Sequence, residues 1–370
     1  MKIVISSNTS WSIYNFRLNL IRALREEGFE VIIVAPYDKY TDGLKKEFEY
    51  HDIFMNNKGT NPIEDFQTFF QYYRLYKKIK PSLALHYTIK PNIYGTLANS
   101  LLGIKTINNI SGLGTLFIKQ SFSTTIARFL YKISLSQSSK VFFQNKDDYH
   151  LFINEKLVHL DKCGILPGSG VDVKKFYPIQ VAKKDDYFKF LLIARMLWDK
   201  GVGEYVEAAK IIKNKYKNVQ FLLLGPIGVN NLTAISKKQI EKWEEEQIII
   251  YLGETDLVRE QIAQVDCVVL PSYREGTSRT LLEAASMAKP IVTTNVPGCK
   301  EVVDDGVNGF LCRLRDSKDL SEKMEKILNL SEEERVKMGQ KSREKIIKEF
   351  DEKIVIDKYI QTIKSLLKYQ

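Results

Sequence analysis

The chain has 370 residues, of which 44% are hydrophobic and 27% charged, so it can bury more than one sizeable core and is expected to form about two domains. No apolar run approaches the roughly 18 uncharged residues of a membrane-spanning helix, and residues 1–16 show no signal-peptide pattern, so we expect a cytoplasmic protein. The net charge of +10 is uneven, because residues 1–178 hold 23 of the 55 Lys and Arg but only 15 of the 45 Asp and Glu. This asymmetry favours an anionic partner, either a membrane surface or a phosphate-bearing acceptor, whereas no motif or base-stacking pattern indicates nucleic acid. The alternative is a generally lysine-rich proteome.

Short β-branched apolar runs alternate with helix-period stretches along the whole chain, which is the pattern of parallel sheets covered by helices. A helix is expected to begin near Phe16 and to end at Gly28, between the first two strands. The strands predicted in this half are Lys2–Ser6, Val31–Ala35, Ser82–Tyr87, Thr106–Ile110, Lys140–Gln144 and Cys163–Leu166.

The alternation of apolar strand runs and helix-period stretches is interrupted over Gly170–Pro178, and polar residues 181–186 follow. This interruption predicts a domain boundary. The alternation then restarts, which predicts domains over residues 1–178 and 179–350. The fold class is therefore α/β, with two Rossmann-like, doubly wound domains of similar size. An amphipathic helix over residues 351–370 is expected to pack back on the first domain. The strands predicted in the second half are Phe188–Ala194, Val219–Gly225, Ile248–Leu252, Cys267–Pro271 and Ile291–Thr294.

Two cations follow the first strand of the second half: Arg195 ends that strand and Lys200 opens the next helix. Ligands of open parallel sheets bind beyond the carboxyl ends of the strands, so both cations are expected at that edge. Their five-residue offset lets them face one anion together with the helix N-terminal amides, and a nucleotide diphosphate is such an anion. The alternative is an exposed Arg and a solvated first-turn Lys.

Two carboxylates eight residues apart bracket a loop-to-helix junction after another strand, with Glu275 in the loop and Glu283 one turn into the helix. Carboxylates accept hydrogen bonds from vicinal hydroxyl pairs, so one can hold a ribose and the other a hexose. The amides of Gly276 and Thr277 can meanwhile face phosphate. The alternative for Glu283 is an ordinary glutamate on a helix surface.

These elements together resemble the retaining GT-B glycosyltransferases of family 4, over essentially the whole chain. The Arg-x4-Lys-Gly and Glu-x7-Glu elements, the hinge Gly170–Asp172 and the segment Pro297–Gly309 occur in the family's order and spacing. The resemblance implies the GT-B fold, in which two Rossmann-like domains face each other across a cleft. It implies that Arg195 and Lys200 bind the donor diphosphate, Glu275 the sugar hydroxyls and Glu283 the ribose, and that the other donor-binding residues are Gly276, Thr277 and Ser278.

The match departs from the family at two places. Thr277–Ser278 stand where many members have Phe-Pro, and the first loop, Ser6–Ser12, lacks the usual Gly-Gly.

Two segments that follow strands of the first domain, His86–Gly95 and Ile110–Thr115, resemble members that build capsule, O-antigen and lipid-linked N-glycan precursors. Among these is the GalNAc transferase that extends undecaprenyl-diphosphate-bacillosamine. His86 is a candidate catalytic, sugar-contacting residue by this resemblance, and the alternative is a structural histidine. Arg17 and Lys90 are expected to bind acceptor phosphate. The full set of acceptor-binding candidates is Asn15, Arg17, Lys90, Asn92, Ser111 and Gly112.

Neither a metal nor another cofactor is predicted. The sequence has no Asp-x-Asp pair, which holds a divalent cation on the donor diphosphate in GT-A enzymes, so Arg195 and Lys200 are expected to neutralise the leaving group. The four cysteines lie far apart, and no Cys-x-x-Cys pair or Cys/His cluster indicates a disulfide framework or a zinc site.

The predicted activity is transfer of a HexNAc or hexose, with GalNAc as the first choice, from a UDP-sugar to a polyprenyl-diphosphate-linked saccharide. Retention without a candidate nucleophile fits front-face attack, in which the departing diphosphate takes the acceptor proton. One alternative is a GT-B sugar-nucleotide epimerase, which needs a cluster of carboxylates and histidines, and the chain has four His. The other is a non-catalytic sugar-nucleotide-binding protein. No Gly-x-Gly-x-x-Gly follows the first strand of either domain, which disfavours an oxidoreductase.

Aromatic and basic residues mix over Leu116–Ile133 and Phe66–Lys78, as in segments that lie at a membrane interface. They suggest a peripheral protein on the inner face of the cell membrane. The alternative is ordinary sheet-covering helices whose lysines extend to solvent.

Overall fold

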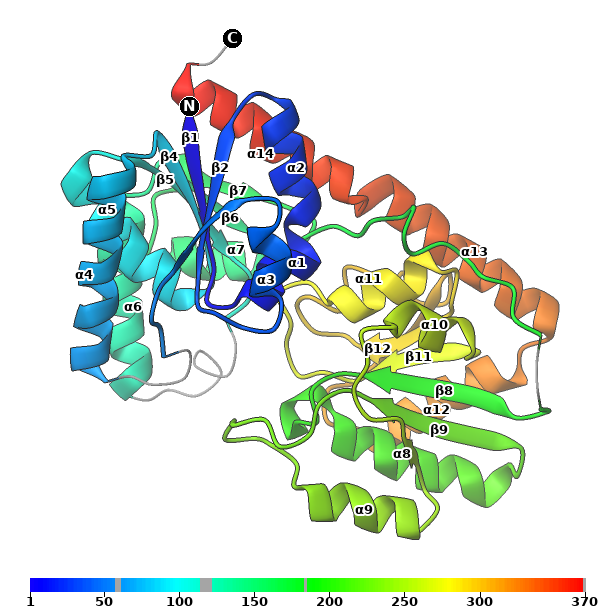
Figure 1. The fold of residues 1–370 in the computed structure, drawn as a ribbon. Coiled ribbons are helices and arrows are strands. Elements are labelled where there is room, and N and C mark those ends of the chain that lie inside the picture. Colours follow the sequence, from blue (N-terminus) through cyan, green and yellow to red (C-terminus); the bar gives the residue numbers. More distant parts are fainter. Residues whose placement is uncertain (57–60, 114–121, 183–184, 369–370) are drawn as a thin grey trace. The chain divides into compact units, whose positions relative to one another are not determined.

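The computed structural model describes residues 1–56, 61–113, 122–182 and 185–368, which form two compact units (Figure 1). Unit 1 comprises Met1–Ser169 and Lys353–Gln370, and unit 2 comprises Gly170–Glu352. Each unit holds one parallel sheet between two layers of helices, which confirms the predicted α/β class with two doubly wound, Rossmann-like halves.

The chain enters unit 2 at Gly170, which corrects the boundary predicted after residue 178. Val171 is fully buried and Phe176 is 5% exposed within the core of unit 2, so this stretch belongs to that unit. Val171 also joins the far end of the unit, because its N–H donates to Phe350 O at 2.9 Å and its carbonyl accepts from Glu352 N at 3.1 Å.

The sheet of unit 1 contains the strands β1 (Lys2–Ser6), β2 (Glu30–Ala35), β3 (Glu49–Asp52), β4 (Leu83–Tyr87), β5 (Lys105–Ile110), β6 (Lys140–Phe143) and β7 (Cys163–Ile165). Their spatial order is β3-β2-β1-β4-β5-β6-β7. Ile3 and Ile5 face one layer of helices and Val4 faces the other, as expected for a parallel strand that is buried on both sides. The register places Tyr87 of β4 directly beside Asn109 of β5.

The helical elements of unit 1 are α1 (Ser10–Phe16), α2 (Leu18–Glu26), α3 (Thr41–Lys45), α4 (Pro62–Ile79), the π-helical turn η1 (Pro91–Gly95), α5 (Thr96–Leu102), α6 (Phe122–Ser136), α7 (Lys146–Asn154), the short turn η3 (Leu160–Lys162) and α14 (Glu352–Leu367). Helices α1, α2, α3 and α14 cover one face of the sheet, and α4, α5, α6 and α7 cover the other (Figure 1). Their buried side chains pack on the sheet residues of the same face. The helix predicted from near Phe16 to Gly28 is confirmed as α2, and a separate helix that was not predicted, α1, precedes it, where Thr9 Oγ1 caps the N-terminus by accepting from Ser12 N at 3.2 Å.

The sheet of unit 2 contains β8 (Phe188–Ile193), β9 (Val219–Leu224), β10 (Ile250–Tyr251), β11 (Cys267–Leu270), β12 (Ile291–Thr294) and β13 (Gly309–Cys312). Their spatial order is β10-β9-β8-β11-β12-β13, so β8 and β11 are neighbours at the centre. The loops that leave these two strands therefore begin side by side at the carboxyl edge. The sequence predictions missed β3 and β13, both of which are edge strands that bury fewer apolar residues than central ones.

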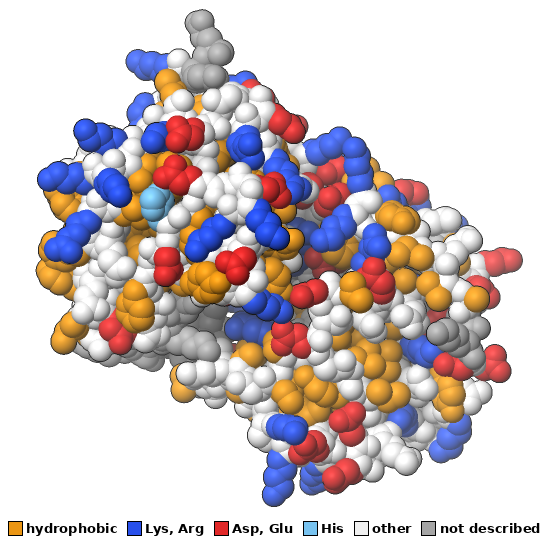
Figure 2. Space-filling view, viewed as in Figure 1, with side chains coloured by type: hydrophobic (Ala, Val, Ile, Leu, Met, Phe, Trp, Pro, Cys, Tyr) orange, Lys and Arg blue, Asp and Glu red, His pale blue; other side chains and the backbone are white. Residues whose placement is uncertain are grey.

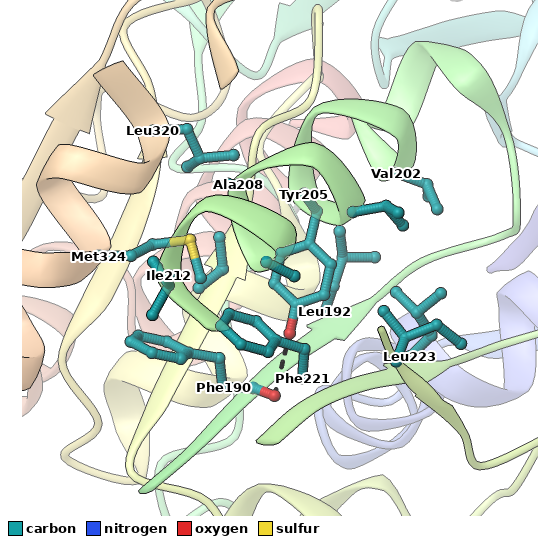
Figure 3. Close-up of a cluster of buried hydrophobic side chains, with 14 of the residues drawn as sticks. Phe190, Leu192, Val202, Tyr205, Ala208, Ile212, Phe221, Leu223, Leu320 and Met324 are labelled. Carbon is teal, nitrogen blue, oxygen red and sulfur yellow. Dashed lines mark hydrogen bonds between the residues drawn. The ribbon is translucent and has the colours of Figure 1, made fainter. Parts of the chain in front are cut away.

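The helical elements of unit 2 are η4 (Trp198–Lys200), α8 (Val202–Lys215), α9 (Lys237–Glu245), α10 (Val258–Ala263), α11 (Arg279–Ser286), α12 (Ser317–Asn329) and α13 (Glu332–Glu349). Helices α8, α9 and α12 cover one face of the sheet, and α10 and α11 cover the other. Figure 3 shows the core beneath α8, where Tyr205 packs against Phe190 and Phe221 and its hydroxyl donates to Phe190 O at 3.0 Å.

Candidate active site

Arg195 and Lys200 both lie at the carboxyl edge of the unit 2 sheet. Arg195 follows β8 and is exposed, and within the described part of the chain no hydrogen bond or ion pair occupies its guanidinium. Lys200 ends η4, and Gly201 then turns the chain into α8 with φ of +71°. A Cβ at Gly201 would lie 2.1 Å from Pro271 O, so only glycine lets this bend pack against the end of β11.

The loop after β8 is joined to the loop after β11 by backbone and side-chain contacts. Tyr273 N donates to Asp199 O at 2.9 Å, and Ser272 Oγ donates to the same carbonyl at 3.3 Å. The ammonium of Lys200 forms an ion pair with Glu275, and the two side chains are only 18% and 15% exposed. The structure thus brings together the cation and the carboxylate that the sequence placed in separate motifs.

A glycine turn holds the Glu275 loop from the other side. Glu275 N donates to Pro297 O at 3.0 Å, and Ser278 N donates to Gly298 O at 2.8 Å. Gly298 has φ of +80°, and a Cβ there would lie 2.4 Å from Glu275 O. The position of Glu275 therefore depends on Gly298 as much as on its own strand.

Glu283 points back along α11, where its Oε1 accepts from Arg279 Nε at 2.8 Å in a pair that is 17% and 13% exposed. The Arg279 guanidinium also donates to Gly170 O at 2.5 Å. Ser278 is buried and caps α11, because its Oγ accepts from Leu281 N at 3.4 Å. Gly276 is buried and Thr277 half-buried in the same loop. Three cations, Arg195, Lys200 and Arg279, and two carboxylates, Glu275 and Glu283, thus belong to this edge of unit 2. The cations can contact a diphosphate, and the carboxylates can accept hydrogen bonds from sugar hydroxyls.

In unit 1, His86 is fully buried in the layer below η1, which corrects its candidacy as a catalytic residue. Its ring nitrogens are hydrogen-bonded to the hydroxyls of Tyr76 at 3.0 Å and Thr96 at 3.2 Å. A Cβ at Gly95 would lie 2.7 Å from the ring, so the main chain of η1 covers it. Burial lowers the pKa of His86 to about 3, so the ring is neutral at physiological pH. The structural alternative is therefore favoured.

Lys90 and Asn92 are also engaged inside unit 1 rather than presented to a ligand. Lys90 Nζ lies 2.6 Å from Asp65 Oδ1, and these side chains are 12% and 17% exposed. Asn92 is fully buried, donates to Asn109 O at 2.9 Å and accepts from Asn108 Nδ2 at 3.0 Å. These contacts pair the charge of Lys90 and use the amide of Asn92 within unit 1.

Arg17, Ser111 and Gly112 remain at the carboxyl edge of the unit 1 sheet. The Arg17 guanidinium lies 4.3 Å from the centre of the Tyr87 ring and donates to Phe16 O at 2.9 Å, and no carboxylate pairs with it among the described residues. Ser111 Oγ donates to Asn109 Oδ1 at 2.8 Å, and Gly112 has φ of +118°. Asn15 lies on α1, where its side chain donates to Trp11 O at 3.0 Å.

Two family models match the chain: "Glycosyl transferases group 1" over residues 173–345 and "Glycosyl transferase 4-like" over residues 2–145. The chain is a glycosyltransferase of the GT-B class. The glycosyltransferase is 29% identical over 388 residues to the N,N'-diacetylbacillosaminyl-diphospho-undecaprenol alpha-1,3-N-acetylgalactosaminyltransferase of Campylobacter jejuni, and 100% of both chains is covered.

The glycosyltransferase is also 23% identical to the UDP-Gal:alpha-D-GlcNAc-diphosphoundecaprenol alpha-1,3-galactosyltransferase of Escherichia coli, over 93% of this chain and 90% of that one. Among solved structures, Anabaena HepE in complex with UDP has a TM-score of 0.77 at 16% identity and covers 99% of this chain and 100% of its own. This last likeness concerns the fold.

Sequence reasoning about this glycosyltransferase missed the residues that join its two loops in unit 2. Asp199 lies inside the Arg-x4-Lys-Gly element and Tyr273 lies two residues before the Glu-x7-Glu element, but no local pattern predicts that the two residues contact each other. Gly298 has a local signal, a Pro-Gly turn between two predicted elements, yet the loop that it supports lies more than twenty residues earlier in the chain. Such partners become visible only once the strand order is known.

In the described residues of the glycosyltransferase, no helix combines the length and apolarity of a membrane span, and no three His, Cys, Asp or Glu side chains converge as in a metal site. Cys299, next to the glycine turn, is buried, and burial raises the pKa of its thiol well above the usual range. That thiol stays protonated and is a poor nucleophile.

Proposed function

We propose that this glycosyltransferase moves a HexNAc or hexose, with GalNAc as the first candidate, from a UDP-sugar to a saccharide carried on a polyprenyl diphosphate. The observation that carries the proposal is the ion pair of Lys200 with Glu275 at the sheet edge where Arg195 follows β8. Two relatives whose names specify diphospho-undecaprenol substrates support the choice of acceptor. The name of one of them also specifies a UDP-sugar donor.

In the proposed reaction, unit 2 binds the donor. Arg195 and Lys200 hold the diphosphate, Glu275 accepts hydrogen bonds from the transferred sugar, and Glu283 accepts them from the ribose. Gly276, Thr277 and Ser278 line the donor on the same loop. No metal ion is required, because the two cations supply the positive charge that the leaving UDP needs.

Retention follows from attack on the face that UDP leaves. The bond between the anomeric carbon and the β-phosphate oxygen breaks, and the acceptor hydroxyl oxygen forms the new bond on the same face. The departing diphosphate takes the acceptor proton, so the step needs no protein nucleophile. The chemical part assigned to the protein is to hold the diphosphate oxygens so that the negative charge is stabilised as it develops.

Unit 1 is proposed to bind the acceptor through Arg17, Ser111 and Gly112, with Asn15 nearby on α1. Arg17 is 8% exposed as a residue, and its guanidinium contacts Phe16 O and the Tyr87 ring but no carboxylate in the described part of the chain, and burial of a cation without a counter-charge is unfavourable. An anionic group such as the acceptor diphosphate supplies that missing charge. Lys90 and Asn92 support this edge from within the core and make no proposed contact with the acceptor.

We also propose that unit 1 docks peripherally on the cytoplasmic face of an anionic membrane. Helix α6 exposes Ile126, Phe129 and Ile133 at helical spacing, with Phe129 62% exposed. Helix α4 exposes Ile63 and Phe66, which are 70% and 62% exposed. In Figure 2, basic and apolar side chains alternate along the edge of unit 1 that α4 and α5 form. This is the composition of an interfacial surface. Residues 116–121 of the predicted interfacial segment, Lys119 included, lie outside the described residues.

The experiment is a donor screen that measures UDP release from purified protein with short-chain lipid-diphosphate saccharides, with product linkage determined by NMR. We expect release to depend on both a UDP-sugar and a lipid-diphosphate acceptor, and the product to have the α configuration of the donor. Equal rates with an acceptor that lacks phosphate would overturn the acceptor class. Isomerisation of the donor alone would indicate the epimerase, and binding of UDP-sugars without any turnover would indicate the non-catalytic protein.

A further inference from the structure

The C-terminal helix α14 contributes one aromatic side chain to the middle of unit 1. Tyr359 is 1% exposed, and its ring packs edge-on against Phe142 with centroids 5.3 Å apart. The same ring lies 6.2 Å from that of Tyr87. The hydroxyl of Tyr359 thereby reaches the sheet from a helix far away in the sequence.

That hydroxyl accepts a hydrogen bond from Asn109 Nδ2 at 2.8 Å. The other end of the same amide, Asn109 Oδ1, accepts from Ser111 Oγ at 2.8 Å and from Gln144 Nε2 at 3.3 Å. Each hydroxyl can both donate and accept, so these partners hold the Asn109 side chain in place from both ends of its amide.

Tyr359 is also linked to Arg17, through the ring of Tyr87. Asn109 and Tyr87 are direct neighbours in the register of β5 and β4, and the Tyr359 ring packs beside Tyr87. The Arg17 guanidinium lies over that Tyr87 ring at 4.3 Å. One residue of α14 therefore supports both Ser111, through Asn109, and Arg17, through Tyr87.

We infer that Tyr359 is a positioning residue of the acceptor site, so that the C-terminal helix is part of the substrate-binding machinery. The inference rests on the proposed function, in which Arg17 and Ser111 bind the acceptor. Tyr359 touches no substrate and acts by fixing the side chains that do. The buried hydroxyl is the chemically specific part, because the ring alone fills the space.

The test is Tyr359→Phe, which keeps the ring and removes the hydroxyl. We expect the KM for a lipid-diphosphate acceptor to rise about five- to tenfold, the loss associated with one hydrogen bond, while the KM for the UDP-sugar stays within twofold. Tyr205→Phe is the matched control: its hydroxyl is equally buried and hydrogen-bonded, but it lies in unit 2. It should lower the melting temperature similarly without raising the acceptor KM.

A double-mutant cycle with Asn109→Ala tests whether Tyr359 acts on the acceptor site through Asn109 or only through the overall stability of unit 1. If Tyr359 acts through Asn109, the two substitutions are non-additive, and Tyr359→Phe has little further effect on acceptor KM once Asn109 is gone. An unchanged acceptor KM in Tyr359→Phe, or strict additivity, would overturn the inference. Failure of the proposed function is a different result, because the wild-type enzyme would then release no UDP with lipid-diphosphate acceptors.

Discussion

Lys200 and Glu275 form an ion pair at the carboxyl edge of unit 2, although 75 positions separate them in the chain. Both side chains are largely shielded from solvent, so each holds the other in place. Arg195 at the same edge is exposed. Under the proposed function, an incoming diphosphate meets Arg195 first and shares Lys200 with Glu275, so the carboxylate orients the lysine as well as binding sugar hydroxyls.

Arg195→Ala is expected to lower turnover by about 10²–10³-fold, because one charge that stabilises the leaving diphosphate is removed. The side chain is exposed and unpaired among the described residues, so the melting temperature should change little. Steady-state rates of UDP release and a thermal melt measure the two effects. Arg313→Ala, another exposed arginine of unit 2 with a 73% exposed side chain, is the control and should retain parental activity. Activity of Arg195→Ala within threefold of the parent would contradict the diphosphate assignment.

Gly298→Ala and Gly306→Ala form a matched pair. Both positions have left-handed backbone, with φ of +80° and +77°, which costs an alanine about 1–2 kcal/mol. A Cβ at Gly298 also meets Glu275 O at 2.4 Å, whereas one at Gly306 meets nothing within 4 Å. We therefore expect Gly298→Ala to destabilise by at least about 1 kcal/mol more than Gly306→Ala and to lower kcat/KM for the donor. Equal effects of the two changes on stability and activity in urea unfolding and rate assays would argue against the supporting role of this turn.

Chelation should leave the enzyme active. Because Arg195 and Lys200 are proposed to neutralise the leaving group, millimolar EDTA is expected to change the initial rate of UDP release by less than twofold. The assay is run with metal-free buffers and repeated with added Mn²⁺ or Mg²⁺. Loss of activity with EDTA that manganese or magnesium restores would show that a cation performs the role proposed for the two side chains.

Burial of His86 is expected to lower the stability of unit 1 against unfolding at acidic pH. Its pKa is about 3 in the folded protein, below its ordinary value of 6.5, so the unfolded chain binds the proton more readily. The stability from the neutral ring is complete above pH 6.5 and is lost as pH falls from there towards 3, by up to about 1.4 kcal/mol per pH unit. Urea unfolding from pH 7 to 4.5 should show a shallower acid slope for His86→Gln than for the parent. Parallel slopes would mean that the ring is not kept neutral by burial.

Membrane docking is tested by changing apolar rather than charged residues. Phe66→Gln with Phe129→Gln should reduce co-sedimentation with anionic vesicles severalfold, because both rings are 62% exposed and are proposed to enter the interface. Leu257→Gln removes a similarly exposed apolar side chain from unit 2 and is the control. Binding should also weaken with salt, since the Debye length falls from about 8 Å at physiological ionic strength to about 3 Å at 1 M. If the double variant co-sediments with vesicles as much as the parent does, the proposal that α4 and α6 dock on the membrane is wrong.

The arrangement of strands was predictable because parallel sheets covered on both faces produce continuous apolar runs, such as Phe188–Ile193. The same property explains the error at His86. Both faces of β4 are buried, so alternation along the strand does not reveal whether a polar residue faces a ligand or a helix. Tyr76 and Gly95, which enclose the ring, come from other elements.

The candidate site in unit 2 was predictable as residue types at strand ends, and its internal partners were not. Arg195, Lys200, Glu275 and Glu283 all follow strands and gather at one edge, as the topology requires. Lys90 illustrates the limit: it too follows a strand, but Asp65 of α4 pairs with it. An ion pair between distant segments depends on helix packing, which the local pattern does not contain.

The placement of α14 has a consequence for how the protein is made. Unit 2 is a continuous insertion, Gly170–Glu352, between two parts of unit 1. During synthesis, Asn109 leaves the ribosome 250 residues before its partner Tyr359, and the apolar face that α14 covers stays open for that interval. Unit 2 can therefore finish folding before unit 1, although its translation starts later. A nascent chain that ends before α14 exposes the apolar face of unit 1, and chaperones are expected to bind such a surface.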